Sequence, residues 1–302
     1  MVATAGDTRV RTEPEPVGPV TGRPREKNNV KLVLYLVGGA LSLVVFVVPL
    51  LWALMRSLQS NDTITAAPSM ATFFHFTFGN FRGIVQDGHI PRAVVNSLIV
   101  SVSTAILTTL LATLAGYGFG RFTFRNSNIA FGLIILTLMV PFQAILTPLF
   151  MQLNAMRLTD NLLGLVLFYS TVNLPFGVFV MRTAFAAVPD TLEDAALIDG
   201  CGTTRTLIHV LRPLVVPGMA TTALYAFLAA WTEFLGALTF LTRQDLYTLP
   251  VSLVNLQQGA YGQVNYGFLA SGAVLAMIPC VILFVALQRF YVAGLAAGAV
   301  KG

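Results

Sequence analysis

A short acidic segment between two long apolar runs carries the residues whose types and spacing best suit a binding function. It holds three carboxylates around two adjacent alanines and ends in glycine: Glu193, Asp194, Ala195, Ala196, Asp199 and Gly200. Acidic side chains in a first turn stabilise a helix through its dipole, and alanine leaves room for a partner surface to approach. We therefore expect a short helix that binds a soluble protein. The alternative is an amphipathic helix lying on a membrane, but negative charge facing anionic lipid argues against it.

Residue patterns that would indicate catalysis are missing from the sequence. The three histidines, His75, His89 and His209, lack metal-ligand spacing, so we expect no metal site. No phosphate-binding G-x-x-x-x-G-K-[ST] loop, nucleophile elbow or zinc-protease motif occurs. Cys201 and Cys280 fall in a predicted cytosolic loop and a predicted span, so no disulfide is expected. We expect no catalytic residue and no cofactor bound by this chain.

Composition identifies the chain as a membrane protein. Hydrophobic residues make up 56% of the 302 and charged residues only 10%, whereas a soluble domain carries about 25% charged residues. Six apolar runs are long enough to cross a bilayer as helices, at about 31–55, 94–120, 128–150, 161–184, 214–240 and 266–291. We expect an all-α, polytopic integral membrane protein with six transmembrane helices. The net charge of +5 does not indicate a nucleic-acid partner, because the basic residues flank the apolar runs.

The distribution of lysine and arginine predicts the orientation. If the amino terminus is cytosolic, thirteen of the 18 basic residues fall on the cytosolic side and five on the other. Basic residues are enriched in cytosolic loops, so we expect both termini to be cytosolic. Residues 1–29 are expected to be a disordered cytosolic tail, residues 30–291 the transmembrane domain, and residues 292–302 a cytosolic tail.

Small residues and prolines within the runs predict how the helices pack and bend. The second run carries small side chains at three- or four-residue spacing, which favours close helix contact in lipid: Ser97, Ser101, Ala105, Thr109, Ala112, Gly116 and Gly120. Pro141 and Pro148 fall in the third run and favour a kink there.

The segment at about 188–213 is expected to contain two short helices. Pro189 suits a first helical position, where its missing amide hydrogen costs nothing. Gly200 is suited to end the first helix. The second helix, over about 203–211, is expected to stop at Pro213 before the fifth span.

The same segment resembles the EAA signature of ABC importer permeases. The match consists of Asp194-Ala195-Ala196, three residues, Gly200, nine residues, Val210, two residues and Pro213. Aspartate stands at 194 where the signature has glutamate, and arginine stands at 212 where leucine is usual. The resemblance implies the type I ABC importer permease fold, with a coupling helix that sits in a cleft of an ATPase subunit. Its ATPase-coupling residues would be Glu193, Asp194, Ala195, Ala196, Asp199, Gly200, Val210 and Pro213.

Other segments resemble the maltose-type sugar permeases, the MalG-like branch of that family. These are an external loop at about 241–265, the carboxyl-terminal segment at 288–302, and the tetrapeptides at 96–99 and 231–234. In that branch the external loop reaches into the opened binding protein, and the tail contacts the ATPases. The resemblance implies binding-protein contacts at Gln257, Gln258, Gly259 and Tyr261.

Glu233 is the one acid that we place inside a predicted span. A charge in mid-bilayer costs about 2.5–3.5 kcal/mol on insertion scales, so it must face protein or water or be protonated. With Thr232 it could line a pathway or form an interhelical hydrogen bond. The alternative is a position near the outer interface, since the neighbouring Trp231 is typical of that depth.

The resemblance implies a non-catalytic transmembrane subunit of an ABC importer for a sugar or sugar-like solute. The implied partners are a second permease subunit, two ATPase subunits that use ATP and Mg, an external solute-binding protein and membrane lipid. An ion-coupled secondary transporter is the alternative, and it predicts internal repeats and several ionisable groups at the midplane. The sequence shows neither. The solute stays open among mono-, di- and oligosaccharides, amino sugars and glycerol-phosphate compounds.

Overall fold

The computed structural model describes residues 29–65, 75–258 and 264–299, and all secondary structure within these ranges is helical. The chain divides into two units, Met1–Pro49 and Leu50–Gly302. The described part of the first unit belongs to α1 (Asn29–Ser57), which continues into the second unit. The tail expected over residues 1–29 lies outside the described residues, except for Asn29.

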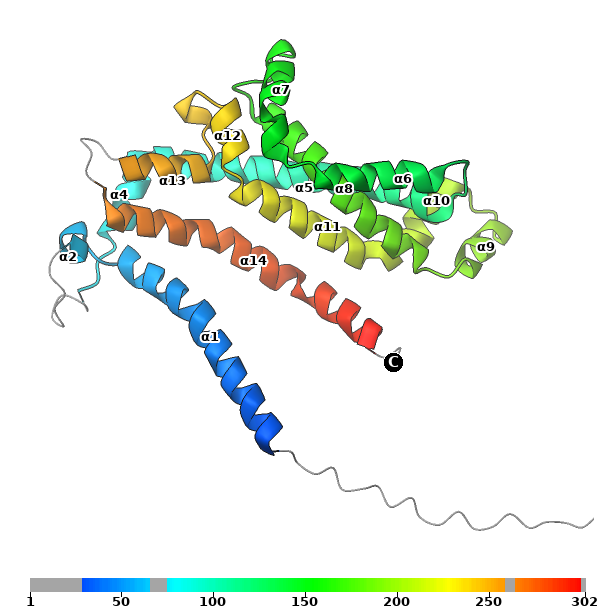
Figure 1. Cartoon of the computed structure of the whole chain (residues 1–302), viewed down its shortest axis with the longest axis horizontal. Coiled ribbons are helices and arrows are strands. Elements are labelled where there is room, and N and C mark those ends of the chain that lie inside the picture. Colours follow the sequence, from blue (N-terminus) through cyan, green and yellow to red (C-terminus); the bar gives the residue numbers. More distant parts are fainter. Residues whose placement is uncertain (1–28, 66–74, 259–263, 300–302) are drawn as a thin grey trace, which may run out of the picture. The chain divides into compact units, whose positions relative to one another are not determined.

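The second unit consists of helices that follow one another with short connections (Figure 1). After α1 they are α2 (Asn61–Thr65), α4 (Gly79–Asp87), α5 (His89–Arg121), α6 (Ser127–Leu136), the 3₁₀ turn η1 (Thr137–Met139), α7 (Phe142–Ala155), α8 (Leu162–Ala186), α9 (Thr191–Ile198), α10 (Thr203–Thr206), the π-turn η2 (Leu207–Leu211), α11 (Arg212–Thr232), α12 (Leu235–Phe240), the 3₁₀ turn η3 (Gln244–Leu246), α13 (Leu249–Gln258) and α14 (Tyr266–Ala299).

The described helices confirm an all-α fold with five or six candidate membrane spans. Five are long and apolar enough to cross a bilayer: Leu32–Ser57, His89–Arg121, Leu162–Ala186, Thr203–Thr232 and Tyr266–Gln288. The pair formed by Ser127–Met139 and Phe142–Ala155 makes a sixth if its two halves are one span. The last helix continues to Ala299, so the expected boundary at residue 291 is not a helix end.

The third apolar run bends by 99° between η1 and α7. The break falls at Val140 and Pro141, which have extended ψ values of 116° and 122°. A proline disfavours helical geometry in the residue before it, and its own nitrogen cannot donate a hydrogen bond. Pro148 lies inside α7, away from the break. Of the two prolines that favoured a kink, Pro141 is therefore the one at the bend.

The fifth apolar run, expected as one span over 214–240, is interrupted. Its helix ends at Thr232, Glu233 is extended, and α12 starts at Leu235. The prediction of an unbroken span is therefore wrong, and the polar side chain of Glu233 explains the break, as shown below.

Helix α5 lies at the centre of the second unit and packs along α8 and α11 (Figure 1). A Cβ atom added to Gly116 would lie 2.4 Å from Cβ of Met181, and one added to Gly177 would lie 2.8 Å from Cβ of Ala112. The two helices can approach this closely only because both contribute glycine where they meet. The small-residue stripe predicted from the sequence is confirmed as a packing face.

Candidate functional site

The acidic segment forms a separate helix, α9, at the end of the second unit where α5 and α8 terminate (Figure 1). We expected Pro189 to occupy the first helical position, but it does not. It precedes the N-cap residue Asp190, and Thr191 begins the helix. The amide hydrogens of Glu193 and Asp194 both bond to the Asp190 carbonyl, so the first turn is closed by backbone atoms.

Gly200 ends α9, as the sequence predicts. Its φ is +77°, in the left-handed region that residues with a Cβ rarely adopt. The Gly200 amide bonds to the Leu197 carbonyl at 3.0 Å and the Cys201 amide to the Ala196 carbonyl at 2.9 Å. This pair of bonds is the Schellman arrangement, which satisfies carbonyl groups at a helix end and turns the chain sharply.

Arg121, the last residue of α5, holds the start of α9 against the helix bundle. Its Nη2 donates a 2.8 Å hydrogen bond to the Val188 carbonyl, and the guanidinium pairs with the carboxylates of Asp190 and Glu193. Tyr117 donates a further hydrogen bond of 3.2 Å to Glu193. The Arg121 side chain is 5% exposed and that of Glu193 21%, whereas Asp190 is 87% exposed, so water screens the Asp190 pair most. We call these four side chains and the Val188 carbonyl the Arg121 clamp.

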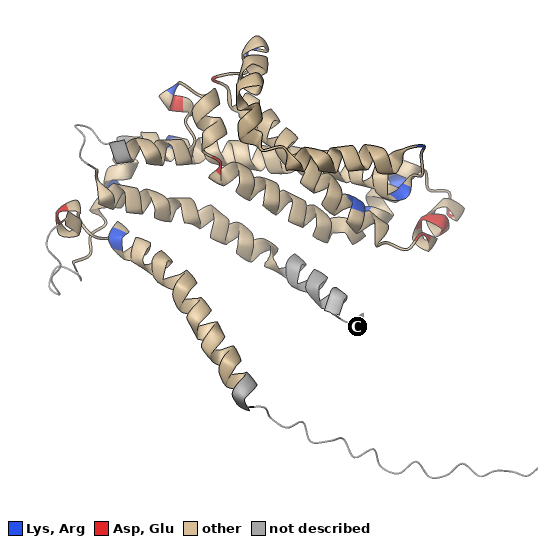
Figure 2. Ribbon diagram, viewed as in Figure 1, with Lys and Arg blue, Asp and Glu red and all other residues tan. Residues whose placement is uncertain are grey.

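Most of the remaining surface of α9 is exposed. Asp194 and Leu197 are exposed beside the Arg121 clamp, where they line a pocket with Tyr117, Arg121 and Glu193. Ala195, Ile198 and Asp199 are exposed further round the helix, and Ile198 is 87% exposed. The Asp194 carboxylate makes no hydrogen bond or ion pair with any residue that the structure describes. Figure 2 shows acidic colour on α9 and basic colour at neighbouring helix ends, while the long helices carry almost no charge. The predicted coupling residues on and directly after α9 therefore fall into two groups. Glu193 contacts Arg121 and Tyr117, and Ala196 is buried, whereas the other four are exposed: Asp194, Ala195, Asp199 and Gly200.

The second half of the segment differs from the expectation. No helix stops at Pro213, because Thr203–Thr232 is one continuous helix with the π-turn η2 just before Pro213. A proline in a regular α-helix clashes with the carbonyl four residues earlier, and a π-turn widens the helix at that point. Val210 is half-buried and Pro213 exposed. Because η2 packs against α9, both parts of the predicted signature meet at this end of the unit.

Glu233 lies in the break between α11 and α12, where it caps α12. Its carboxylate accepts hydrogen bonds from the amides of Leu235, Gly236 and Ala237 at 2.8–3.3 Å. Tyr169 of α8 donates a further hydrogen bond of 2.6 Å. The carboxylate is therefore satisfied by helix-end amides and by one interhelical bond, rather than by a counter-ion. The hydroxyl of Thr232 bonds back to the Leu228 carbonyl within its own helix.

The predicted external loop is held to the opposite end of α5. The buried amide of Asn96 donates to the carbonyls of Asp245 and Tyr247 at 3.0 and 3.1 Å, and the Leu249 amide donates to the Ser97 hydroxyl at 2.8 Å. Gln257 and Gln258 are the last residues of α13, and the structure describes their backbone but not their side chains. Gly259 and Tyr261 lie outside the described residues, so the expected binding-protein contacts stay a prediction.

Two aspartates at this end of the unit carry lowered pKa values. A side-chain hydrogen bond from Arg243 chiefly lowers the pKa of Asp245, which also pairs with Arg92 at 3.3 Å. Hydrogen bonds from the Thr242 hydroxyl and amide, both of 2.6 Å, lower the pKa of Asp160. Asp160 comes just before α8 and Thr242 just after α12, so this bond ties two connections together.

Sequence reasoning missed three residues of these sites: Tyr117, Arg121 and Tyr169. The signal that could have found Arg121 is its position, since it directly follows Gly120 at the end of the small-residue stripe, on the side of the membrane predicted for the acidic segment. We used it only to assign orientation. The tyrosines carry no comparable signal, because aromatic residues are common throughout these spans.

Comparison with known proteins identifies the family. Residues 109–296, more than half of the chain, match the model described as binding-protein-dependent transport system inner membrane component. A putative ABC transporter permease from Streptomyces antibioticus is 40% identical over 75% of this chain and 98% of its own length. The trehalose transport system permease SugB of Mycobacterium tuberculosis is 32% identical over 84% of this chain and 92% of its own. The diacetylchitobiose permease NgcG of Streptomyces coelicolor is also 32% identical, over 82% of this chain and 81% of its own.

The fold matches a solved structure as well. A chain of a bacterial ABC transporter that imports the polysaccharide alginate superimposes with a TM-score of 0.76 at 19% identity, over 89% of this chain and 99% of that one. The likeness confirms the fold expected from the sequence. The chain thus belongs to the binding-protein-dependent transport system inner membrane components, as a non-catalytic, multi-pass permease subunit of an ABC importer.

Proposed function

We propose that this permease subunit imports a carbohydrate and that α9 couples it to an ATPase subunit. The carbohydrate assignment is supported by relatives named for trehalose, diacetylchitobiose and arabinooligosaccharides. The working assembly would contain a second permease subunit, two ATPase subunits that bind ATP and Mg, and an external solute-binding protein. A related solved transporter, that for alginate, is described in complex with its periplasmic protein.

The observation that carries the coupling proposal is the two-sided character of α9. One side is fixed to α5 by the Arg121 clamp, and the other presents exposed apolar and acidic side chains. A helix with exposed Leu197 and Ile198 beside Asp194 suits a groove that is apolar with a basic rim. This end of the chain would face the cytosol, with both termini on the same side.

The contacts also suggest how movement would reach the spans. When the ATPases close on ATP, they would displace α9, and the Arg121 clamp would transmit the displacement to α5. Because α5 packs along α8 and α11, the three helices would tilt together and change the side to which the pathway opens. In this scheme nucleotide binding biases an element that has two states.

A test replaces the outward side chains of α9 in the complete importer. Asp194→Lys and Ile198→Asp should lower copurification of the ATPase subunits and abolish uptake, while the chain still inserts into the membrane. Asp62→Lys in α2 is the control, because Asp62 is an exposed acid on the opposite side in the proposed orientation. Normal uptake and normal ATPase copurification in both α9 variants would refute the coupling role.

A second measurement tests the substrate class. Cells that lack the chromosomal copy would be complemented with this chain and offered a panel of labelled mono-, di- and oligosaccharides. ATP-dependent uptake of at least one is expected. If the importer takes up none of them but accumulates another class of solute, the carbohydrate assignment is wrong while the coupling role of α9 is unaffected.

A further inference from the structure

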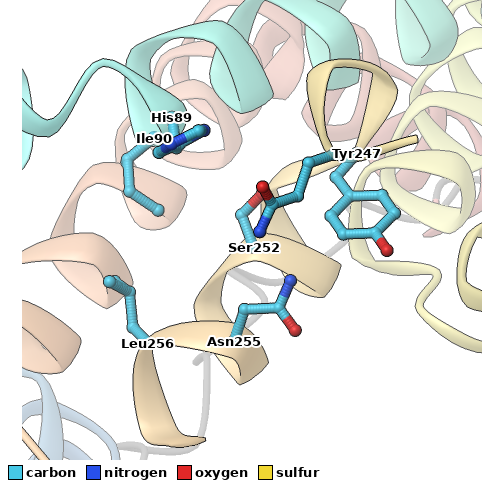
Figure 3. Close-up of a pocket in the computed structure, with 7 residues that line it drawn as sticks. His89, Ile90, Tyr247, Ser252, Asn255 and Leu256 are labelled. Carbon is cyan, nitrogen blue, oxygen red and sulfur yellow. The ribbon is translucent and has the colours of Figure 1, made fainter. Parts of the chain in front are cut away.

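A polar pocket of about 160 Å³ lies at the end of α5 that is remote from the Arg121 clamp (Figure 3). His89 and Ile90, the first residues of α5, form one side of it, and Ser252, Asn255 and Leu256 of α13 face them across the opening. Gln244 and Tyr247, from the chain between α12 and α13, complete the lining. In the proposed orientation this pocket opens on the external side.

The pocket combines a buried floor with a polar rim. Ile90 is 1% exposed and Ser252 7%, so these two form the floor. His89, Gln244 and Asn255 are exposed at the rim, and their side chains make no hydrogen bond with any part of the chain that the structure describes. Amide side chains both donate and accept hydrogen bonds, so this rim can pair with a group that also does both.

The walls of the pocket are fixed before any ligand arrives. Asn96 and Ser97, both buried in α5, bond to the backbone at residues 245, 247 and 249, which carries Tyr247 and leads into α13. The Tyr247 hydroxyl bonds to the Thr242 carbonyl at 3.2 Å, so the phenol ring is held as well. A preformed site loses less conformational entropy on binding than a mobile loop does.

We propose that this pocket is a carbohydrate subsite that receives one sugar ring of the arriving solute. Hydroxyl groups donate and accept, as the rim amides and the Ser252 hydroxyl do, and the Tyr247 ring and Leu256 offer surface to the apolar face of a sugar. The lining has no lysine, arginine, aspartate or glutamate, which suits a polyhydroxylated ring better than an ionic group. The pocket holds one ring rather than two. This inference rests on the proposed carbohydrate function.

The experiment measures whether sugar protects the pocket from chemical labelling. In a background with Cys201→Ser and Cys280→Ser, the variants Asn255→Cys and Gln244→Cys would each be placed in the complete, reconstituted importer. A membrane-impermeant maleimide would then be applied with and without the saccharide that the unmodified importer transports in the panel described above. We expect the saccharide to slow labelling at both positions at least threefold, and a saccharide that is not transported to have no effect.

Two further variants sharpen the result. Gln86→Cys in α4 is the matched control, because Gln86 is an exposed amide outside the pocket on the same side, and its labelling should not respond to sugar. Adding Ser252→Ala to Asn255→Cys should raise the half-protecting sugar concentration about two- to tenfold, as expected for one lost neutral hydrogen bond.

The outcomes separate the two proposals. Labelling that is unchanged by sugar at both pocket positions, or is slowed equally at Gln86, overturns the subsite while carbohydrate transport still stands. Protection by the sugar-free binding protein alone also overturns it, because the pocket would then be a protein contact. If the unmodified importer transports no saccharide, the proposed function and the subsite fall together.

Discussion

Removing the Arg121 side chain is the sharpest perturbation that the structure offers. Arg121→Ala deletes the hydrogen bond to the Val188 carbonyl and the ion pairs to Asp190 and Glu193. A hydrogen bond from a charged donor contributes about 1.5–3 kcal/mol, and the exposed Asp190 pair adds about 0–1 kcal/mol. The partly buried Glu193 loses its cation and keeps only Tyr117.

These contributions amount to about 1.5–4 kcal/mol for keeping α9 in place, or roughly 10- to 700-fold in the ratio of molecules with α9 held to molecules with α9 released. We expect the Arg121→Ala importer to hydrolyse ATP at its basal rate, with uptake at least tenfold lower, because a released α9 no longer moves α5. The assay compares ATP hydrolysis and solute uptake in proteoliposomes that contain equal amounts of complex. Uptake by the Arg121→Lys importer should lie between that of the unmodified importer and that of Arg121→Ala, since one ammonium group cannot reproduce the planar, forked contacts of the guanidinium.

Arg125→Ala is the matched control, because Arg125 is exposed four residues further on and forms no ion pair with the described residues. A double variant tests whether Arg121 acts through Glu193. If Arg121 acts through Glu193, the double variant Arg121→Ala, Glu193→Ala should be little worse than Arg121→Ala alone. Uptake within twofold of the unmodified importer in Arg121→Ala, or fully independent losses in the double variant, would refute the Arg121 clamp.

Three other changes test the conformations that support this site. Gly200→Ala forces a side chain into φ +77° at a cost of about 1–2 kcal/mol, so uptake should fall at unchanged membrane content. Gly116→Ala should lower the melting temperature of the complex, because its Cβ would lie 2.4 Å from the facing helix, whereas Gly118→Ala, with nothing within 4 Å, should not. Hydrogen bonds from Thr242 lower the pKa of Asp160 in the folded chain. The resulting stabilisation is present above the ordinary aspartate pKa of 3.8 and is lost as pH falls through the folded pKa. Melting curves between about pH 3 and 7 should therefore show a smaller acid loss in Asp160→Asn than in the unmodified chain.

Much of the fold follows from the sequence because hydrophobicity and side-chain size are local properties. Each apolar run must satisfy its backbone hydrogen bonds internally in lipid, which leaves the helix as the available structure. The stripe that includes Gly116 and Gly120 is likewise readable, since close helix contact requires the absence of side chains at repeated positions. The turn at Gly200 follows for the same reason, from the conformational freedom of a residue without a Cβ.

The interruptions of the helices are harder to predict from the sequence, because their causes lie in other segments of the chain. Glu233 looks like an acid within a span until Tyr169 of α8 and the amides of α12 are placed around it. The break places the Glu233 carboxylate next to the first amides of α12, which have no hydrogen-bond acceptor within their own helix. Similarly, Pro213 predicts a helix end, but η2 removes the clash and lets the helix continue. Proline specifies which hydrogen bond is lost, but not how the chain adjusts.

The two candidate sites are connected by one uninterrupted helix. α5 runs from His89 at the polar pocket to Arg121 at the clamp and has no proline beyond its first turn, whereas α1, α7, α8, α11 and α14 each contain one inside the helix. At 1.5 Å per residue its 33 residues extend about 50 Å, enough to cross the whole bilayer. A displacement applied at Arg121 therefore reaches the residues around His89 with little loss to bending, while the proline-containing helices can flex around it. This difference in stiffness makes α5 the element through which the coupling end and the external end would change together.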